Sequence, residues 1–232
     1  MSKRIHGIFS RISGSYDLMN HLLSFGVDVK WRRDTVSEIL KMSKGRKNLQ
    51  VLDIATGTGD LAISLSEAFK KGNINAQITA MDFNDDMLLL ADRKSRKSGT
   101  DILFEHGDAV RMKYGAGSFD VLTSGFALRN FDDLVRFAEE SHRVLKKGGF
   151  FVFVDMAMPD EKAKQYFFKI YSLYMRLLGF FVDNESYKWL VHSIKAFDKK
   201  ALEKKLRVAG FRNVRQRELS SGIGYIILGE KR

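Results

Sequence analysis

The sequence predicts one α/β domain whose central sheet is doubly wound, mostly parallel and seven-stranded. Three observations predict this fold. Apolar runs of strand length alternate with helical patterns from residue 49 onward, which is typical of a parallel sheet with helices on both faces. A glycine-rich turn follows the first run. The last two runs are separated only by residues 220–222, a connection so short that it predicts an antiparallel hairpin at the C-terminus.

The first 45 residues are expected to be helical. Apolar side chains repeat there at helical spacing, at Ile5, Ile8, Phe9 and Ile12. A second helical pattern runs over 31–41, and Gly14 and residues 24–26 interrupt the two patterns. These helices precede the first strand and form an N-terminal part over 1–45.

Strands and helices then alternate as in a Rossmann-like fold. Five apolar strands are expected over 49–54, 77–82, 101–105, 119–124 and 149–155, and two final strands over 212–219 and 223–229. Helical patterns cover 59–70, 85–97, 131–146 and 198–209. We expect Gly148-Gly149 to end the third of these helices as a C-cap and Gly210 to end the fourth.

Residues 160–195 interrupt this alternation. Aromatic and aliphatic side chains surround almost the whole circumference of the helix expected over 166–181. A helix of this kind is usually buried in a core. Because it is inserted into the sheet pattern, we expect a helical cap over the ligand crevice. The chain is therefore expected to be one domain, 1–232, with the N-terminal helices and this inserted cap.

Composition narrows the classes of function. The 232 residues contain no cysteine, which excludes disulfides, cysteine zinc sites and thiol nucleophiles. The histidines lack metal-ligand spacing, so no metal site is expected. No apolar run approaches the ~20 residues of a membrane span, and residues 1–6 lack a signal-peptide core. We therefore expect a cytoplasmic protein. The net charge of +11 favours an anionic partner, either a membrane surface or a nucleic acid.

Residues 51–60 form a buried strand that breaks into a glycine turn and enters a helix. Gly57 and Gly59 let a ligand approach the backbone, and the turn leads that ligand to the N–H groups of a helix N-terminus. Asp53 narrows the choice, because a carboxylate repels a diphosphate and attracts an ammonium group. S-adenosylmethionine (SAM) carries an ammonium and a carboxylate at its amino-acid end and no phosphate. The turn therefore predicts a SAM site.

Three further strand ends supply candidate cofactor contacts, since ligands of open α/β sheets lie beyond the carboxyl ends of the strands. Asp82 ends the second strand, at the position of a carboxylate that binds ribose hydroxyls. After the third strand, Asp108 can accept from an adenine amino group while the Ala109 N–H donates to the ring. Gly125 ends the fourth and leaves room for the methionine portion.

Other interpretations of these residues stay open. Gly57–Ala62 also fits the dinucleotide fingerprint of an oxidoreductase, although Asp53 would face the pyrophosphate. Taken singly, Asp82 fits a helix N-cap and Asp108 a turn residue. The basic charge suits a SAM enzyme acting on RNA, but residues 124–130 lack the Asn-Pro-Pro-Tyr type of turn. A domain that kept the fold for binding alone is a third alternative. A P-loop is excluded, because no Gly-Lys-Ser/Thr follows the turn.

Six segments carry a resemblance to a known family; the Tyr-Asp-x-Met-Asn and Leu-Arg-Asn sequences among them are specific, whereas the glycine turn is common to a whole superfamily. The six segments are Phe9–Asn20, Leu23–Gly26, Trp31–Arg33, Asp53–Asp60, Phe126–Asn130 and Arg143–Gly149. With them the chain resembles the ubiquinone/menaquinone biosynthesis C-methyltransferases, a class I SAM-dependent family, over nearly its whole length. This resemblance implies methylation of a ring carbon of a polyprenylated quinol, either demethylmenaquinol or a methoxy-polyprenyl-benzoquinol. The chain departs from the family at Asp198, where a proline is usual, and in the Ala-Thr-Gly-Thr-Gly form of its turn.

The resemblance also implies roles for individual residues. Thr58 joins Asp82, Asp108 and Ala109 as a cofactor contact, and Arg129 resembles an arginine that organises substrate activation. Asn130 follows it in the same Leu-Arg-Asn segment and is grouped with the catalytic candidates.

Ring methylation requires that the phenolic proton leave, so a proton acceptor is needed. Arg129 cannot be this acceptor unaided, because a guanidinium stays protonated; it also fits a purely structural ion pair. The candidate acceptors are Asp17, Tyr16 and His192, with Asp17 or a water molecule ranked first.

The expected partners follow from the substrate. A polyprenyl tail has to leave a bilayer, and the basic surface and aromatic cap suggest peripheral contact with an anionic membrane, worth ~1 kcal/mol per basic residue. No nucleic acid partner is expected. The sequence leaves open which quinol is methylated and whether the chain forms a homodimer.

Overall fold

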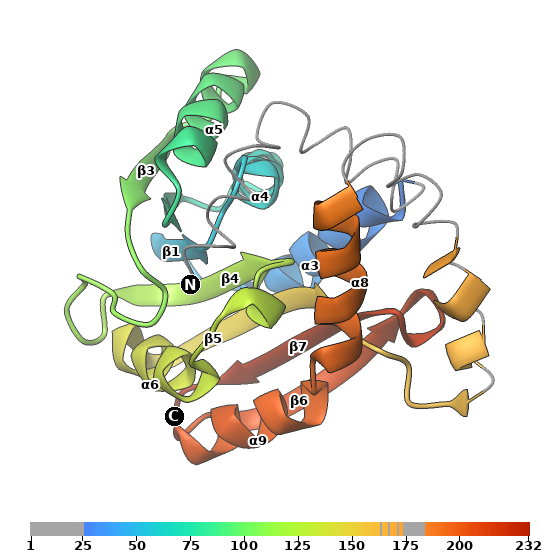
Figure 1. Ribbon diagram of the computed structural model, residues 1–232. Helices are drawn as coiled ribbons and strands as arrows, with labels where there is room; N and C mark the ends of the chain where they lie inside the picture. The colour runs from blue at the N-terminus through green and yellow to red at the C-terminus, as the bar shows by residue number, and fades with distance from the viewer. Residues whose placement is uncertain (1–25, 163, 167, 171, 174–183) are drawn as a thin grey trace.

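The computed structural model describes residues 26–162, 164–166, 168–170, 172–173 and 184–232, and its centre is a seven-stranded sheet (Figure 1). The strands are β1 (Leu49–Ile54), β2 (Ala76–Asp82), β3 (Ile102–His106), β4 (Phe119–Gly125), β5 (Leu145–Met156), β6 (Arg212–Leu219) and β7 (Gly224–Glu230). Their order is β3-β2-β1-β4-β5-β7-β6. β1 to β5 pair in parallel, whereas β7 is antiparallel to both β5 and β6. This confirms the predicted doubly wound sheet with its C-terminal hairpin.

Helices cover both faces of the sheet (Figure 1). They are α3 (Val27–Met42), α4 (Asp60–Lys71), α5 (Asp85–Ser98), α6 (Leu134–Val144), α8 (Asn184–Ala196) and α9 (Lys199–Val208), with short 3-10 turns η2 (Leu128–Asn130) and η3 (Ser220–Gly222). Side chains of α3 and α4 pack on one face, and those of α6 and α9 on the other. Successive side chains of β5 point to opposite faces of the sheet. Phe150 and Val152 are buried in the core under α3 and α4, and Phe151 and Phe153 in the core under α6 and α9.

The predicted end of the third helix is wrong. α6 stops at Val144 and the chain enters β5 directly, so the helix does not reach residue 146 and Gly148-Gly149 is not its C-cap. The strand register gives the physical reason. Leu145 and Phe150 pair with Phe119 and Val121, so Lys146–Gly149 bulge out opposite one residue of β4. Gly148 has φ +74 within this bulge, a conformation that glycine adopts without strain.

Parts of the expected helical regions lie outside the described residues. These parts are the helix expected over 5–12 and residues 174–183 of the cap. The second N-terminal pattern is α3, which begins four residues earlier than residue 31. From the cap region, α8 contacts η2, the turn that follows β4. Within the described part of the chain, no helix is both long and apolar enough to cross a membrane.

Candidate functional site

A cavity of about 1040 Å³, including its open mouth, lies at the carboxyl ends of the parallel strands. The loops after β1, β2, β3 and β4 all contribute to its wall. Seven of the eight cofactor residues predicted from the sequence line it, namely Asp53, Gly57, Thr58, Asp82, Asp108, Ala109 and Gly125. Gly59 is not in this wall. It precedes α4 with φ +82, and a Cβ there would lie 3.0 Å from the Cβ of Ala91, so Gly59 shapes the turn and allows close packing against α5.

Asp53 presents an unsatisfied acceptor in this wall. Its side chain is 0% exposed, and its Oδ2 accepts a hydrogen bond of 2.6 Å from the hydroxyl of Thr56. Its Oδ1 is buried and has no hydrogen-bond partner in the described structure. Burial raises the pKa of Asp53 to about 7, against the lowering effect of the Thr56 bond and with a smaller raising effect of Asp82. A buried acceptor of this kind suits a cationic donor such as an ammonium group.

Asp82 fixes the glycine turn as well as lining the cavity. Its Oδ2 accepts from the N–H of Gly57 at 2.7 Å and its Oδ1 from the N–H of Asn84 at 2.9 Å. Burial raises the pKa of Asp82, and these N–H donors partly offset that effect. The helix N-cap is Asn84, whose side chain accepts from Asp86 and Met87. The alternative of Asp82 as the cap of α5 is therefore wrong.

Asp108 combines the two roles considered for it. Its Oδ1 accepts from the N–H of Val110 at 3.1 Å, as a turn residue does, and the same side chain lines the cavity. The wall beside it is apolar, with Met81, Phe83 and Phe131. An apolar wall that also presents a carboxylate and a backbone N–H suits an adenine ring, which is flat and has a polar edge.

Arg32 is a charged residue in the cavity wall to which the sequence analysis gives no role. It belongs to the Trp31–Arg33 segment and reaches the cavity from α3, with its side chain 15% exposed. Nη2 donates to Asp28 at 2.6 Å, and Nη1 lies 3.5 Å from a carboxylate oxygen of Asp60. The signal that could have indicated a role for Arg32 is its place within the Trp31–Arg33 segment. Nothing in the sequence showed that α3 would run beside the glycine turn.

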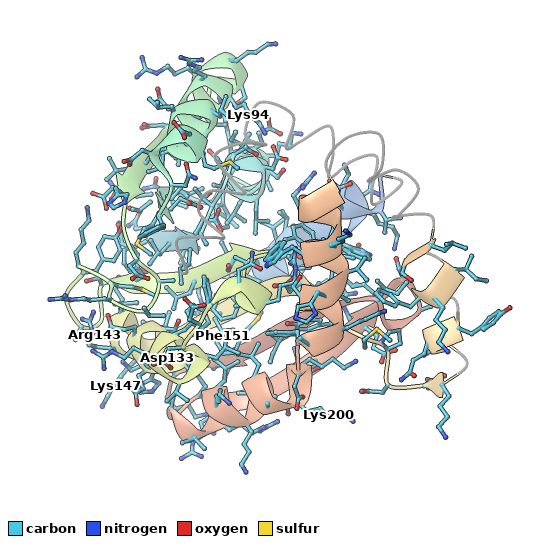
Figure 2. All side chains as sticks on the ribbon, in the orientation of Figure 1. Lys94, Asp133, Arg143, Lys147, Phe151 and Lys200 are labelled. Atoms are coloured by element: carbon cyan, nitrogen blue, oxygen red, sulfur yellow. The ribbon has the colours of Figure 1, made fainter. Side chains whose placement is uncertain are left out.

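Lys94 places a second cation near the turn, from α5 (Figure 2). Its ammonium pairs with Asp60 and donates to the hydroxyl of Thr58 at 3.2 Å. The glycine turn is thus held between Asp82 on one strand end and a charged group of Asp60, Lys94 and Arg32. This arrangement fixes the backbone that the ligand approaches.

The Leu-Arg-Asn segment forms η2, at the end of β4. Asn130 lines the cavity, and its buried Oδ1 has no partner among the described residues. Arg129 lies behind it, with a side chain 6% exposed that pairs with Asp155 and donates to the carbonyl of Phe126 at 2.7 Å. The guanidinium also lies 6.0 Å from the centre of the Trp189 ring on α8. The structure thus contains the buried ion pair considered as an alternative, and a role for Arg129 in substrate activation stays a prediction.

The structure describes one of the three side chains that the sequence predicts as proton acceptors. Asp17 and Tyr16 lie outside the described residues. His192 is exposed on α8. Of the four residues predicted to be catalytic, the structure describes Arg129 and Asn130. Asn130 lines the cavity, and Arg129 is the buried residue next to it.

Comparisons with known proteins agree with this geometry. The model of the ubiE/COQ5 methyltransferase family matches residues 1–231. The demethylmenaquinone methyltransferase of Thermus thermophilus is 35% identical and that of Deinococcus radiodurans 37%, with 97% and 98% of this chain covered and 100% and 92% of theirs. 

Solved structures show the same fold at lower identity. A SAM-dependent methyltransferase from Aquifex aeolicus aligns with a TM-score of 0.60 at 17% identity, over 84% of this chain and 88% of that one. Phosphoethanolamine N-methyltransferase 2 of Haemonchus contortus, in complex with SAM, aligns with a TM-score of 0.63 at 13% identity, over 86% of this chain and 52% of that one. 

These matches exclude the dinucleotide oxidoreductase alternative. Asp53 Oδ1, which has no partner among the described residues, and the apolar wall that includes Asp108 suit the charge and the ring of SAM. The chain therefore belongs to the ubiE/COQ5 methyltransferase family and is a SAM-dependent methyltransferase.

Proposed function

We propose that this enzyme methylates a ring carbon of demethylmenaquinol, a polyprenylated naphthoquinol. The observation that carries the proposal is the full-length similarity to relatives named demethylmenaquinone methyltransferase, at 35% and 37% identity. In the net reaction a ring C–H becomes C–CH₃ and one proton is released. The methoxy-polyprenyl-benzoquinols are the second substrate class, since the sequence resemblance implies either ring.

The contacts of the cofactor follow from the charges in the cavity wall. We assign the ammonium of the methionine portion to Asp53 Oδ1 and its carboxylate to Arg32. We assign the ribose hydroxyls to Asp82, because each of its oxygens accepts one N–H and keeps a second lone pair for a further hydrogen bond. The adenine ring goes to Asp108 and the Ala109 N–H. Gly57, Thr58 and Gly125 complete the wall that the ligand contacts.

The side chains of Arg129 and Asn130 in η2 would stabilise the phenolic oxygen of the substrate. SAM, when bound, supplies an electrophilic methyl group. Arg129 donates hydrogen bonds and stays protonated in its pair with Asp155, so it stabilises a phenolate and does not take the proton. Asn130 Oδ1 can accept from the hydroxyl before deprotonation. Asp17, Tyr16 or a water molecule accepts the proton, and the apolar wall excludes bulk water, which favours the loss of charge on transfer.

Peripheral membrane contact belongs to the same proposal, with the enzyme on the cytoplasmic side. Exposed apolar side chains stand at helical spacing in the cap region, at Tyr166, Ile170 and Leu173. Exposed Lys162 and Lys169 accompany them, and the whole chain carries +11. Apolar side chains flanked by lysines are typical of a surface that lies on anionic lipid.

Vesicle co-sedimentation tests this contact. We expect more binding to anionic than to neutral vesicles, and weaker binding after the double substitution Ile170→Ser, Leu173→Ser. Val208→Ser is the matched control, because Val208 is an exposed apolar residue on α9. Equal binding to both lipids, or an equal effect of the control, would remove the membrane contact from the proposal.

Methyl transfer from labelled SAM tests the substrate. The purified enzyme is given reduced demethylated naphthoquinols, methoxy-benzoquinols with long and short tails, and bulk RNA. We expect label in the naphthoquinol. Label in RNA alone would support the RNA alternative. No label in either quinol, with SAM binding verified by calorimetry, would overturn the quinol proposal and keep the cofactor.

A further inference from the structure

Asp155 is a buried carboxylate next to the proposed catalytic segment, and the reaction described above uses it only as the ion-pair partner of Arg129. It stands near the end of β5, with a side chain 0% exposed. β5 is the neighbour of β4 in the sheet, and η2 follows β4. The carboxylate therefore faces η2 from the adjacent strand.

The contacts of Asp155 join three donors. Its Oδ1 accepts from the guanidinium Nη1 of Arg129 and from its neighbouring backbone N–H, that of Met156, at 2.7 Å. Its Oδ2 accepts from the backbone N–H of Arg129 at 3.2 Å. One carboxylate thus holds both the side chain and the main chain of Arg129. Nη1 of Arg129 donates in addition to the Phe126 carbonyl at 2.7 Å, which fixes that nitrogen from two sides.

This set of contacts leaves other polar atoms of η2 available. Nε of Arg129 is buried and has no partner among the described residues, and the same is true of Oδ1 of the adjacent Asn130. Buried donors and acceptors without partners are costly, so they are kept where a ligand or a water molecule satisfies them. Of these two residues Asn130 lines the cavity, so its free acceptor suits a phenolic hydroxyl that donates a hydrogen bond, and the free donor of Arg129 belongs to the residue next to it.

We propose that Asp155 is a positioning residue, which holds Arg129 and the backbone of η2 so that the free atoms of Arg129 and Asn130 keep a fixed orientation at the cavity edge. The inference rests on the proposed function of this turn. A long arginine side chain samples many rotamers, and misplacement of a catalytic group by about 1 Å costs about 10²-fold in rate. Asp155 prevents that loss by contacts that do not touch the substrate.

The test compares Asp155→Asn with Arg129→Ala, and with both together. We expect Asp155→Asn to lower kcat at least tenfold while the Kd for SAM changes less than twofold. The double variant is expected to be no slower than Arg129→Ala, because Asp155 acts through Arg129. A purely structural carboxylate would not show this non-additivity.

Asp120→Asn is the matched control. Asp120 lies at the other end of β4, accepts the N–H of Gln50 at 2.8 Å and pairs with Lys146 at 2.8 Å, and does not line the cavity. Asp120→Asn removes a carboxylate that, like Asp155, accepts a backbone N–H and pairs with a cation. Because Asp120 is remote from the cavity, the kcat of this variant is expected to stay within twofold of the wild type. A comparable fall in kcat for Asp120→Asn would attribute the effect of Asp155→Asn to general destabilisation.

An NMR signal of Arg129 gives a second test in case Asp155→Asn folds poorly. In the wild type, the buried Nε–H of Arg129 is expected to give a slowly exchanging ¹⁵N–¹H signal, assigned by its absence in Arg129→Ala. In Asp155→Glu, which keeps the charge with a longer reach, this signal should shift or broaden and kcat should fall less than in Asp155→Asn.

The two proposals fail differently. If Arg129→Ala retains full activity, the proposed role of η2 is wrong, whatever Asp155→Asn does. If Arg129→Ala is inactive while Asp155→Asn keeps wild-type kcat and Asp155→Glu leaves the Nε–H signal unchanged, the positioning role of Asp155 is wrong and the proposed function stands.

Discussion

At the scale of single residues, the site is made from polar groups that are left unsatisfied at a cost to stability. Among the described residues, Asp53 keeps one oxygen without a partner in a fully buried position, and Oδ1 of Asn130 and Nε of Arg129 in η2 are also buried without a partner. Such groups cost stability unless a bound ligand or a water molecule satisfies them. The residues that define the site are therefore ones whose substitution is expected to stabilise the fold while it weakens function.

Asp53→Asn is expected to stabilise the free enzyme at pH 8. The pKa of Asp53 rises from 3.8 in the unfolded chain to about 7 in the folded one, so the folded state binds the extra proton between these values. Protonated Asp53 therefore contributes to the free energy of unfolding below pH 4. This contribution, on the order of 4 kcal/mol, is lost as the pH rises to 7. Denaturant unfolding at pH 4 and pH 8 should give similar midpoints for both proteins at pH 4 and a higher midpoint for the variant at pH 8. Equal midpoints at both pH values would contradict the buried, unpaired carboxylate.

Tyr225→Phe is expected to stabilise the protein by about 1 kcal/mol, because the buried Tyr225 hydroxyl has no partner in the described structure and its desolvation is uncompensated. The matched control is Tyr114→Phe, since the hydroxyl of Tyr114 donates to Glu105 at 2.7 Å. That substitution should destabilise by about the same amount. Thermal unfolding of the two variants measures both effects, and a loss of stability in Tyr225→Phe would show that its hydroxyl is satisfied.

Arg32→Gln tests the assignment of the methionine carboxylate. The wild type is expected to bind SAM at least tenfold more tightly than decarboxylated SAM, because only SAM can pair with the guanidinium. In Arg32→Gln the two ligands should bind with similar Kd values. Calorimetry with both ligands separates this effect from a general loss of the cavity, which would weaken them equally. Unchanged discrimination in the variant would assign the carboxylate to another group.

At the scale of elements, the central strands are identifiable because their apolar runs are continuous and buried on both faces. The largely exposed β6 is identifiable from its position before the short connection over 220–222. The predicted range 49–54 is the range of β1, and β6 also matches its prediction. The boundary between α6 and β5 was missed because a bulge opposite β4 depends on the pairing partner, which a local pattern does not contain. The prediction that a helix begins at residue 131 is three residues too early, because Phe131 is extended and Asp133 caps the helix that begins at Leu134.

The N-cap of α6 gives a prediction at this scale. The carboxylate of Asp133 accepts from the N–H groups of Val135 and Arg136 at 3.0 and 2.9 Å (Figure 2). Asp133→Ala is expected to cost about 1 kcal/mol of unfolding free energy, whereas Asp133→Asn, which caps equally well, should cost little. Urea unfolding measures both variants. Equal losses would show that the charge at the helix N-terminus, and not the cap, is what matters.

At the scale of the whole molecule, the sheet topology is what assembles the site. β1 lies between β2 and β4, so the strand ends that carry Asp53, Asp82 and Gly125 meet at one cavity. The sequence predicted this convergence because parallel strands of an open α/β sheet place their carboxyl ends on one edge. It did not predict Arg32 or Asp155, since both reach the site through packing between elements that no motif connects. Local chemistry at strand ends was therefore predictable, and long-range support was not.

The central claim is that the orphaned oxygen of Asp53 holds the ammonium of SAM in this cavity. Calorimetric titration of SAM into the wild type and Asp53→Asn at pH 8 tests it most directly, with circular dichroism to verify that the variant is folded. An ammonium–carboxylate contact in a buried site is worth about 1.5–3 kcal/mol, so the Kd of the variant should rise about 10- to 100-fold. An unchanged Kd in a folded Asp53→Asn variant would contradict the account.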